Sequence, residues 1–384
     1  MLAIGAFAGD LLSHAHNEAS HGFGYFSINP KALKGTKATH TNVTTIINFW
    51  KHAGLIETTK GFQRRIEFDD GASCRESRSV RYRATDALLS MFREHSLTPE
   101  NARSHFKPDL STAEVLVLRS KRMRKGNKSI GGDLIPFEAT HRTTQLANEI
   151  REINACLENH SFAPMDPPWF RRTFNEGTKK GYRWDKGGRL TVPGDEGYQR
   201  WKPEKRLTIK IDGSPIVEMD VKASHMSIFY GLIGKPWNTS KDPYDIPGMD
   251  RSFVKKMVIR IFGIGELPKK WPKGMKQEYA ELMELDVQKT PPISEIIARI
   301  TEVHPDMISL KRLGIYWAAL QYLESTAIIQ TMLELVRKHD IPSLPVHDSL
   351  IVPIEFASLT ESLLINSYQK HCGCNISVVP RYSD

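Results

Sequence analysis

Residues 343–352 read SLPVHDSLIV, so an aspartate stands between two short apolar runs. An ionised carboxylate buried without a partner costs several kcal/mol, which makes an uninterrupted buried strand through Asp348 unfavourable. The segment therefore predicts a β-hairpin in which Val346 and Leu350 anchor the two arms, while His347 and Asp348 form the bend. The question is then which group shares the site with Asp348.

A second aspartate closes another apolar strand. Alternation over residues 216–221 (IVEMDV) predicts a strand with Asp220 near its end, on the face opposite Met219. Alone, Asp220 could be a turn cap and Asp348 an ordinary hairpin-turn aspartate. Adjacent antiparallel strands can bring the two together, however, and close carboxylates repel unless they share a proton or a divalent cation. The pair favours a Mg²⁺ site of the kind used in phosphoryl transfer.

The chain carries a surplus of basic residues. Its 384 residues include 53 Lys and Arg against 44 Asp and Glu, which gives a net charge of +9 and a pI near 9.2. Such a surplus favours a polyanionic partner such as nucleic acid, although many basic proteins bind none. The length allows two or three domains.

The spacing of the cysteines and the length of the apolar runs indicate the cellular compartment of the protein. The four cysteines lack the spacing of a zinc pair, so we assign no role to Cys372 or Cys374. No apolar run is long enough to cross a membrane, and the first residues, MLAIGAFAGDLL, lack the basic leader and cleavage site of a signal peptide. We therefore expect a reduced, cytoplasmic protein without a membrane partner.

Residues 1–95 predict a DNA-binding module of their own. Polar cap candidates precede a helix whose apolar stripe runs from Val43 to Trp50, and Gly54 ends it. A strand pair around a Lys60-Gly61 turn, a strand in RSVRYRAT and a helix in DALLSMFREH follow. This order, with a basic hairpin tip, is typical of a winged helix; any small α+β module is the alternative.

Residues 96–165 predict a basic linker followed by a helical, thumb-like region. The stretch RSKRMRKGNKSIGG fits a solvated linker or a loop that touches phosphates. A helix is expected at about 138–160. From residue 166 to residue 384 the chain alternates strands and helices, which predicts a second α+β domain.

Five segments occur in order between residues 170 and 352, namely GGRLTVPGDEGYQRWKPEKR, VEMDVKASH, DRSFVKKMVIRIFG, ALQYLESTAII and VHDS. Together they resemble the palm of family A nucleic acid polymerases, the group that contains bacterial DNA polymerase I and the single-subunit phage-type RNA polymerases. The individual motifs are short and common. Their order, and the elements on which they fall, carry the resemblance, which covers slightly under half of the chain.

The resemblance implies a catalytic metal site and contacts to nucleic acid. It implies that Asp220 and Asp348 hold two Mg²⁺ ions, with Mn²⁺ as a substitute, and that the Val221 carbonyl is a further ligand. Contacts to template and primer are implied for Arg189, Gln199, Arg206, Gln321 and His347.

The same resemblance implies that Arg251 and Lys255 grip an incoming triphosphate. On a helix they lie one turn apart on one face, so both can reach one polyphosphate. Lys256 and Arg260 form a second such pair, which is typical of a solvated face.

Two positions depart from the DNA-making members of that family. Their fingers helix carries an aromatic residue where Gly263 stands here, and the nearest aromatic is Phe262. A glutamate that blocks the ribose 2′-hydroxyl is replaced by His225, and Ser349 after the His-Asp pair is more like the RNA-making branch. Nucleotide binding by Phe262 and His225, and the choice between dNTP and NTP, are therefore left open.

A polar stripe interrupts the apolar helix that contains ALQYLESTAII. Gln321, Glu324 and Ser325 fall at positions i, i+3 and i+4. Such a stripe must find partners, either in a substrate cleft or in an internal network, and both alternatives remain open.

We therefore expect an α+β chain with a right-hand polymerase palm at 166–384, reduced fingers at about 235–315 and a winged-helix-like N-terminal module. The expected activity is template-directed nucleotidyl transfer, as a DNA polymerase, a primase or both, of the small type found in plasmids, phages and mobile elements. Expected partners are DNA template and primer, dNTP or NTP, and accessory proteins of the helicase or single-stranded-DNA-binding type. The alternatives are a replication initiator or regulator with a non-catalytic palm, and a metal-dependent nuclease.

Overall fold

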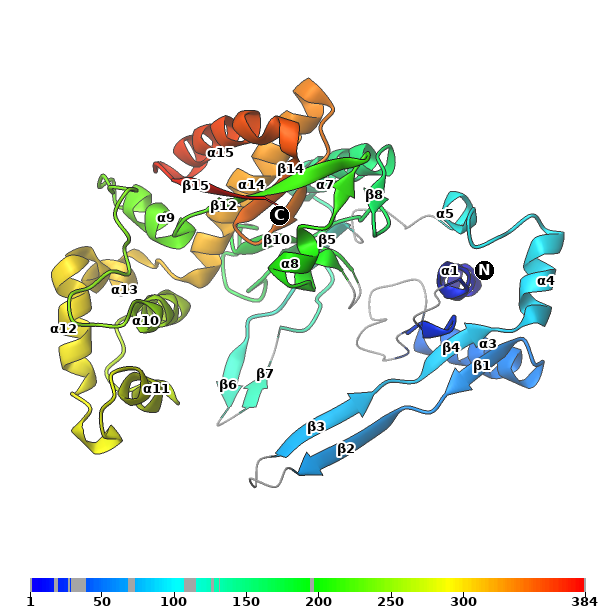
Figure 1. Ribbon diagram of the computed structural model, residues 1–384, viewed down its shortest axis with the longest axis horizontal. Coiled ribbons are helices and arrows are strands. Elements are labelled where there is room, and N and C mark those ends of the chain that lie inside the picture. Colours follow the sequence, from blue (N-terminus) through cyan, green and yellow to red (C-terminus); the bar gives the residue numbers. More distant parts are fainter. Residues whose placement is uncertain are drawn as a thin grey trace. The chain divides into compact units, whose positions relative to one another are not determined.

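The computed structural model describes residues 2–16, 20–26, 28, 39–67, 73–106, 115–125, 128–130, 132–193 and 197–382. The chain divides into two compact units, Met1–Glu114 and Val115–Asp384 (Figure 1). The sequence instead predicts boundaries after residues 95 and 165. The difference arises because the segment after residue 115 supplies a strand and a long helix to the second unit, rather than a separate linker domain.

The first unit has a small apolar core built from two helices and a strand pair. Helix α1 (Leu2–His14) and helix α3 (His40–His52) pack with β1 (Ile56–Thr59) and β4 (Arg81–Ala84), and α4 (Asp86–Glu94) follows. The α3 helix starts where the Thr39 side chain accepts from the Asn42 amide, as its polar cap sequence predicts. The buried core includes Phe7, Leu11, Val43, Ile56 and Tyr82.

The strands of this unit form one long hairpin rather than a tight turn at Lys60-Gly61. β1 pairs with β4, and β2 (Phe62–Glu67) pairs with β3 (Ser73–Arg78), both antiparallel. Figure 1 shows β2 and β3 continuing outward from β1 and β4. The turn prediction at 60–61 is therefore wrong, because both arms break at matching points and then continue. Residues 68–72, which connect β2 to β3, lie outside the described residues, and the winged-helix assignment stays a prediction.

The second unit is organised around an antiparallel sheet whose central strand is β12 (Ser214–Val221). β14 (Ser349–Pro353) pairs along one edge of β12 and β15 (Val378–Tyr382) along the other, while β13 (Leu344–Val346) lies outside β14. β11 (Lys210–Ile211) pairs with the start of β12 and with β8 (Phe162–Ala163). The predicted strand at 216–221 is confirmed, and it is buried on both faces except at Asp220, which is half-buried.

A long helix links this sheet to a second, smaller one. Helix α14 (Trp317–His339) contacts α15 (Ala357–Cys372), α7 (His141–Glu158), α9 (Ser224–Leu232) and strand β10 (Gly187–Thr191). β10 pairs with β9 (Arg171–Phe174), which pairs in parallel with β5 (Leu116–Leu118). Because α14 contacts both β10 and α9, its polar residues can reach side chains from either element.

The insertion between the two predicted metal motifs is helical. It contains α10 (Arg251–Ile264), α11 (Met275–Leu282), α12 (Ile293–Val303) and the short α13 (Leu310–Leu313). The basic stretch near residue 125, for which a linker was one alternative, forms a hairpin of β6 (Met123–Lys125) and β7 (Lys128–Ile130). The described residues thus confirm an α+β chain. None of their helices combines the length and apolarity that crossing a bilayer requires.

Removal of the first unit tests its expected role in DNA binding. Deleting residues 1–114, up to the boundary between the units, is expected to weaken DNA binding and to flatten its salt dependence. The reason is that log K falls with log[salt] by about 0.9 per duplex phosphate neutralised. Fluorescence anisotropy of a labelled duplex over a salt series measures the slope. A slope equal to that of the full chain would contradict the assignment.

Candidate active site

The segment SLPVHDSLIV forms the hairpin that its sequence predicts. β13 and β14 pair with Val346 opposite Ser349, so His347 and Asp348 are the two turn residues. His347 has φ of 56°, a left-handed conformation in which histidine is enriched among non-glycine residues. The backbone therefore places Asp348 at the end of the sheet rather than inside a strand.

Strand pairing brings Asp220 to the same end of the sheet. Asp220 lies opposite Ser349 in the β12–β14 ladder, next to the turn. The amide of Val221 also donates to the carbonyl of Asp348, at 3.4 Å. Adjacent antiparallel strands thus unite the two aspartates, as the sequence predicts.

The two carboxylates are balanced in different ways. Arg381 on β15 donates from Nη2 to Oδ2 of Asp220 at 2.6 Å. Asp348 forms no ion pair with any Lys, Arg or His of the described residues. Burial, followed by the negative charges of Glu324 and Asp220, raises the pKa of Asp348 to about 7. Among the described residues, Asp348 is therefore a carboxylate whose charge no ion pair compensates.

Glu324 on α14 is the centre of a buried polar network. Its Oε1 accepts from Arg189 Nε at 3.1 Å and Nη2 at 2.5 Å, while Oε2 accepts from the Ser224 hydroxyl at 3.0 Å. His225 Nε2 lies 3.2 Å from the same Oε2. Burial alone would raise the pKa of Glu324, but His225 and Arg189 hold it well below its usual range. The polar stripe thus includes an internal network, one of the two alternatives left open by the sequence.

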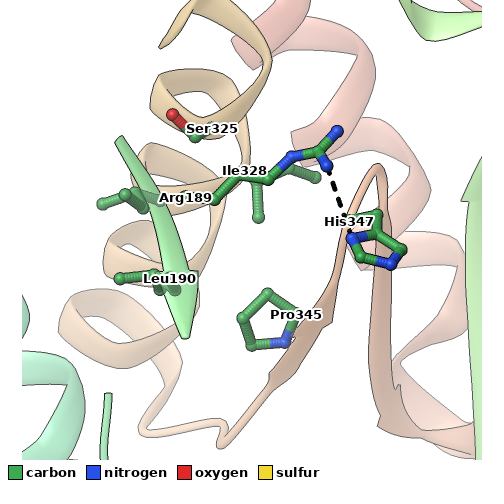
Figure 2. Close-up of a pocket in the computed structure, with 7 residues that line it drawn as sticks. Arg189, Leu190, Ser325, Ile328, Pro345 and His347 are labelled. Atoms are coloured by element: carbon green, nitrogen blue, oxygen red, sulfur yellow. Dashed lines mark hydrogen bonds between the residues drawn. The ribbon is translucent and has the colours of Figure 1, made fainter. Parts of the chain in front are cut away.

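Arg189 connects that network to the hairpin turn. With the Gln321 amide oriented so that its oxygen faces Arg189, it accepts from Nε at 3.2 Å and Nη1 at 3.3 Å. Arg189 Nη1 also lies 3.4 Å from His347 Nδ1, and Figure 2 shows the two side chains meeting at a pocket that Ile328 and Pro345 help to line. Because arginine only donates, Nδ1 accepts and the ring proton is on Nε2. Partial burial and the Arg189 charge lower the pKa of His347, so the ring is neutral at pH 7.

Two of the predicted nucleic-acid contacts are engaged inside the protein. Gln199 donates to the carbonyls of Leu190 and Pro345, at 3.1 and 2.9 Å. Arg206 is buried and donates to both carboxylate oxygens of Glu218, at 3.0 and 2.8 Å. Arg206 therefore has no surface to offer a nucleic acid, and we correct that expectation: it neutralises a buried carboxylate. Gln199 braces β10 against the hairpin.

The predicted triphosphate-binding helix, α10, presents its two basic residues to solvent. Arg251 and Lys255 are exposed one turn apart, and Arg251 Nε donates to Asp242 Oδ2 at 2.5 Å. Lys256 pairs with Glu278, as a residue of a solvated face would. Phe262, by contrast, is 1% exposed and packs in the core beside Phe229, so it cannot stack on a base here. This corrects the expectation for Phe262.

Sequence reasoning missed Arg381 and the central position of Glu324. The C-terminal segment SVVPRY reads as a strand only weakly, and its pairing with β12 is not visible in one sequence. Arg381 lies opposite Glu218 in that ladder and reaches diagonally to Asp220. Glu324 was recognised as polar, but its partners come from β10 and α9.

The residues at the strand ends fit a divalent cation of the Mg²⁺ type. Such ions take oxygen ligands, and the site offers two carboxylates, one of them uncompensated, next to the backbone of Val221. Asp348 can be balanced either by a proton, at or below neutral pH, or by a cation.

No protein-family model and no curated protein sequence matches the chain. Among solved structures, the chain is similar to the POL domain of Pol1 from M. smegmatis in complex with DNA primer-template and dNTP. That match has 12% identity and a TM-score of 0.35, and it covers 98% of this chain and 64% of the other, so this chain spans just under two thirds of its length. A likeness this weak carries no argument about fold or activity.

The pH dependence of stability tests the charge state of Asp348. Its folded pKa of about 7 lies above the unfolded value of about 3.9, so the stabilisation from its bound proton is complete below about pH 4 and is lost as pH rises through 7. In metal-free buffer, the melting temperature of the wild type should therefore fall relative to that of Asp348→Asn between pH 5 and 9.

Asp242→Asn is the matched control. Burial would raise the pKa of Asp242, but the Tyr244 amide and Arg251 lower it, so its titration lies below pH 5. The difference between wild type and Asp242→Asn should be flat from pH 5 to 9. An equally flat difference for Asp348→Asn would show that Asp348 is not the perturbed group.

Proposed function

We propose that the chain is a template-directed nucleotidyltransferase, a DNA polymerase or primase with Asp220 and Asp348 at its catalytic centre. The observation that carries the proposal is the meeting of these two aspartates at adjacent strand ends, with the charge of Asp348 left uncompensated. A right-hand palm built on β12, β13, β14 and β15 would explain why the sheet exposes carboxylates at one end.

Asp220, Asp348 and the Val221 carbonyl would hold Mg²⁺ or Mn²⁺. Bound there, the cation supplies Lewis-acid stabilisation of the charge that develops on a transferring phosphoryl group. Arg381 gives up its ion pair with Asp220 when that carboxylate becomes a ligand, and its guanidinium is then available to a phosphate at the same end of the sheet.

The exposed face of α10 binds the triphosphate. Arg251 and Lys255, one turn apart, offer two cations to one polyphosphate. Arg251 exchanges its contact with Asp242 for a phosphate oxygen, whereas Lys255 is exposed already. His225, held between Glu324 and the buried Phe262, lies beside this helix and is the proposed sugar-side residue.

Arg189, Gln321 and His347 position the template and primer. The Glu324 carboxylate fixes the Arg189 guanidinium, so little side-chain entropy is lost when Arg189 binds a nucleic acid. His347, neutral and with its proton on Nε2, offers one donor at the hairpin turn. Gln199 acts at a distance by bracing the strand that bears Arg189.

The remaining basic surface recruits DNA. The net charge of +9, the β6–β7 hairpin and the winged-helix-like module of residues 1–95 would supply sequence-independent attraction to phosphates. Within this proposal, the enzyme would be of the small polymerase-primase type carried by plasmids, phages and mobile elements. Helicases and single-stranded-DNA-binding proteins would be its accessory partners.

A replication initiator with a non-catalytic palm is the second candidate. It is favoured by the internal neutralisation of Asp220 by Arg381 and of Arg251 by Asp242, both of which occupy groups that catalysis needs. A metal-dependent nuclease is less favoured, because it would leave the paired cations of α10 without a role.

Nucleotide incorporation distinguishes these candidates. The protein is incubated with Mg²⁺ or Mn²⁺, labelled dNTPs or NTPs, and single-stranded DNA with and without a primer. We expect template-dependent product that falls by about 10²-fold or more in Asp220→Asn and Asp348→Asn, as for the loss of a major electrostatic group in an active site. Product without a primer identifies a primase.

Two lysines on one helix provide a matched pair. Lys255→Ala should lower kcat/KM for the nucleotide by about tenfold, equivalent to about 1.4 kcal/mol. Lys256→Ala, which removes only the pair with Glu278, should leave kcat/KM within about twofold. No incorporation under any condition, with DNA binding intact, would instead support the initiator.

A further inference from the structure

A cysteine, a histidine and an aspartate meet away from the proposed catalytic centre. The ligand atoms of Cys156, His160 and Asp340 all lie within 4.8 Å of one another. Cys156 is on the last turns of α7, His160 follows that helix, and Asp340 caps the C-terminal end of α14. Asp340 is 340 − 324 = 16 residues beyond Glu324, about 24 Å along the helix axis.

The imidazole of His160 is held with one nitrogen unused. Its Nδ1 lies 2.6 Å from Oδ2 of Asp212, while its Nε2 is buried and has no hydrogen-bond partner among the described residues. Asp212 is itself fixed, because it accepts from the amide and the hydroxyl of Ser161 at 2.7 and 3.1 Å. A carboxylate that accepts from Nδ1–H favours the tautomer in which Nε2 carries no proton. The Nε2 lone pair can then bind a metal ion.

A ring nitrogen of His160 lies within 4.8 Å of the Cys156 sulfur and of a carboxylate oxygen of Asp340. The Cys156 thiol is buried and donates to Oδ1 of Asp340, with Sγ 3.9 Å from the oxygen. A thiol, an imidazole and a carboxylate thus lie together, and no lysine or arginine of the described residues pairs with any of them.

We propose that Cys156, His160 and Asp340 bind Zn²⁺, with Asp212 positioning His160. Thiolate, imidazole and carboxylate are the ligand types that zinc takes, and the combination of sulfur and nitrogen disfavours Mg²⁺. Tetrahedral zinc separates its ligand atoms by about 3.3–3.8 Å, so the cluster closes by about 1 Å around the ion. Asp340 is exposed and can make that movement, and solvent fills the fourth position.

The site ties together three segments that are remote in sequence. The end of α7, the β11–β12 turn at Asp212 and the end of α14 all contribute to it. Zinc bound there would fasten two helices and a sheet turn of the second unit without using any residue of the proposed catalytic centre. Zinc on the folded state stabilises the protein according to its occupancy.

Metal binding to the full-length, chelator-treated protein tests the proposal. We expect one equivalent of Zn²⁺ by isothermal titration and mass spectrometry, and a near-ultraviolet thiolate-to-metal band when Co²⁺ is used. Asp220→Asn/Asp348→Asn should keep that equivalent, which separates it from the catalytic pair. A Cys372→Ser/Cys374→Ser double variant should also keep it, which excludes these two thiols as the ligands.

Variants of the cluster should lose the ion. Cys156→Ser should abolish the Co²⁺ band, and Asp212→Asn should weaken Zn²⁺ binding about 10–100-fold. Asp340→Asn should weaken binding at least tenfold and should fold normally, because asparagine accepts the left-handed backbone of Asp340, with φ of 53°. Unchanged Zn²⁺ affinity in folded Asp340→Asn, or a wild type that binds no Zn²⁺ and shows no Co²⁺ band, would overturn the proposal.

Discussion

The antiparallel pairing of β12 with β14 places Asp220 beside the turn that carries Asp348. This pairing brings negative charges close together, and neighbouring arginines balance most of them. Three carboxylates near that end of the sheet each have an arginine: Glu218 has Arg206, Asp220 has Arg381, and Glu324 has Arg189. Asp348 has no such partner, so a proton or a cation must supply its balance. Removing the partner of a buried carboxylate costs several kcal/mol, which makes this balance a condition of the fold as well as of function.

The three arginines differ in how firmly they are held. This difference distinguishes the arginine that stabilises the core from those that can take part in ligand binding. Arg206 is buried and bidentate, so it belongs to the core. Arg189 is fixed by Glu324 but remains partly exposed above the pocket in Figure 2, where it can contact a ligand. Arg381 holds Asp220 through one nitrogen and is 44% exposed, so it can leave. Arginines thus balance three of the four carboxylates, and Arg381 is the one that a cation at Asp220 would displace.

The sequence predicts the local features of this site and misses those that need distant partners. An aspartate between apolar runs and an alternating strand are enough to predict the hairpin and the 216–221 strand, because both patterns are local. Phe262 and Arg206 were misjudged since their burial depends on neighbours from other elements. Arg381 and the cluster of Cys156, His160 and Asp340 gave no local signal, because their members meet only after the sheet and helices have packed.

Anomalous diffraction from crystals soaked in Mn²⁺ tests the central claim, that Asp220 and Asp348 together form a divalent cation site, without requiring turnover. The account predicts an anomalous peak within coordination distance of both carboxylates, at about 2.0–2.3 Å, with the Arg381 side chain withdrawn from Asp220. A saturating soak that leaves the ion pair between Arg381 and Asp220 intact, with no peak between the two aspartates, would contradict it.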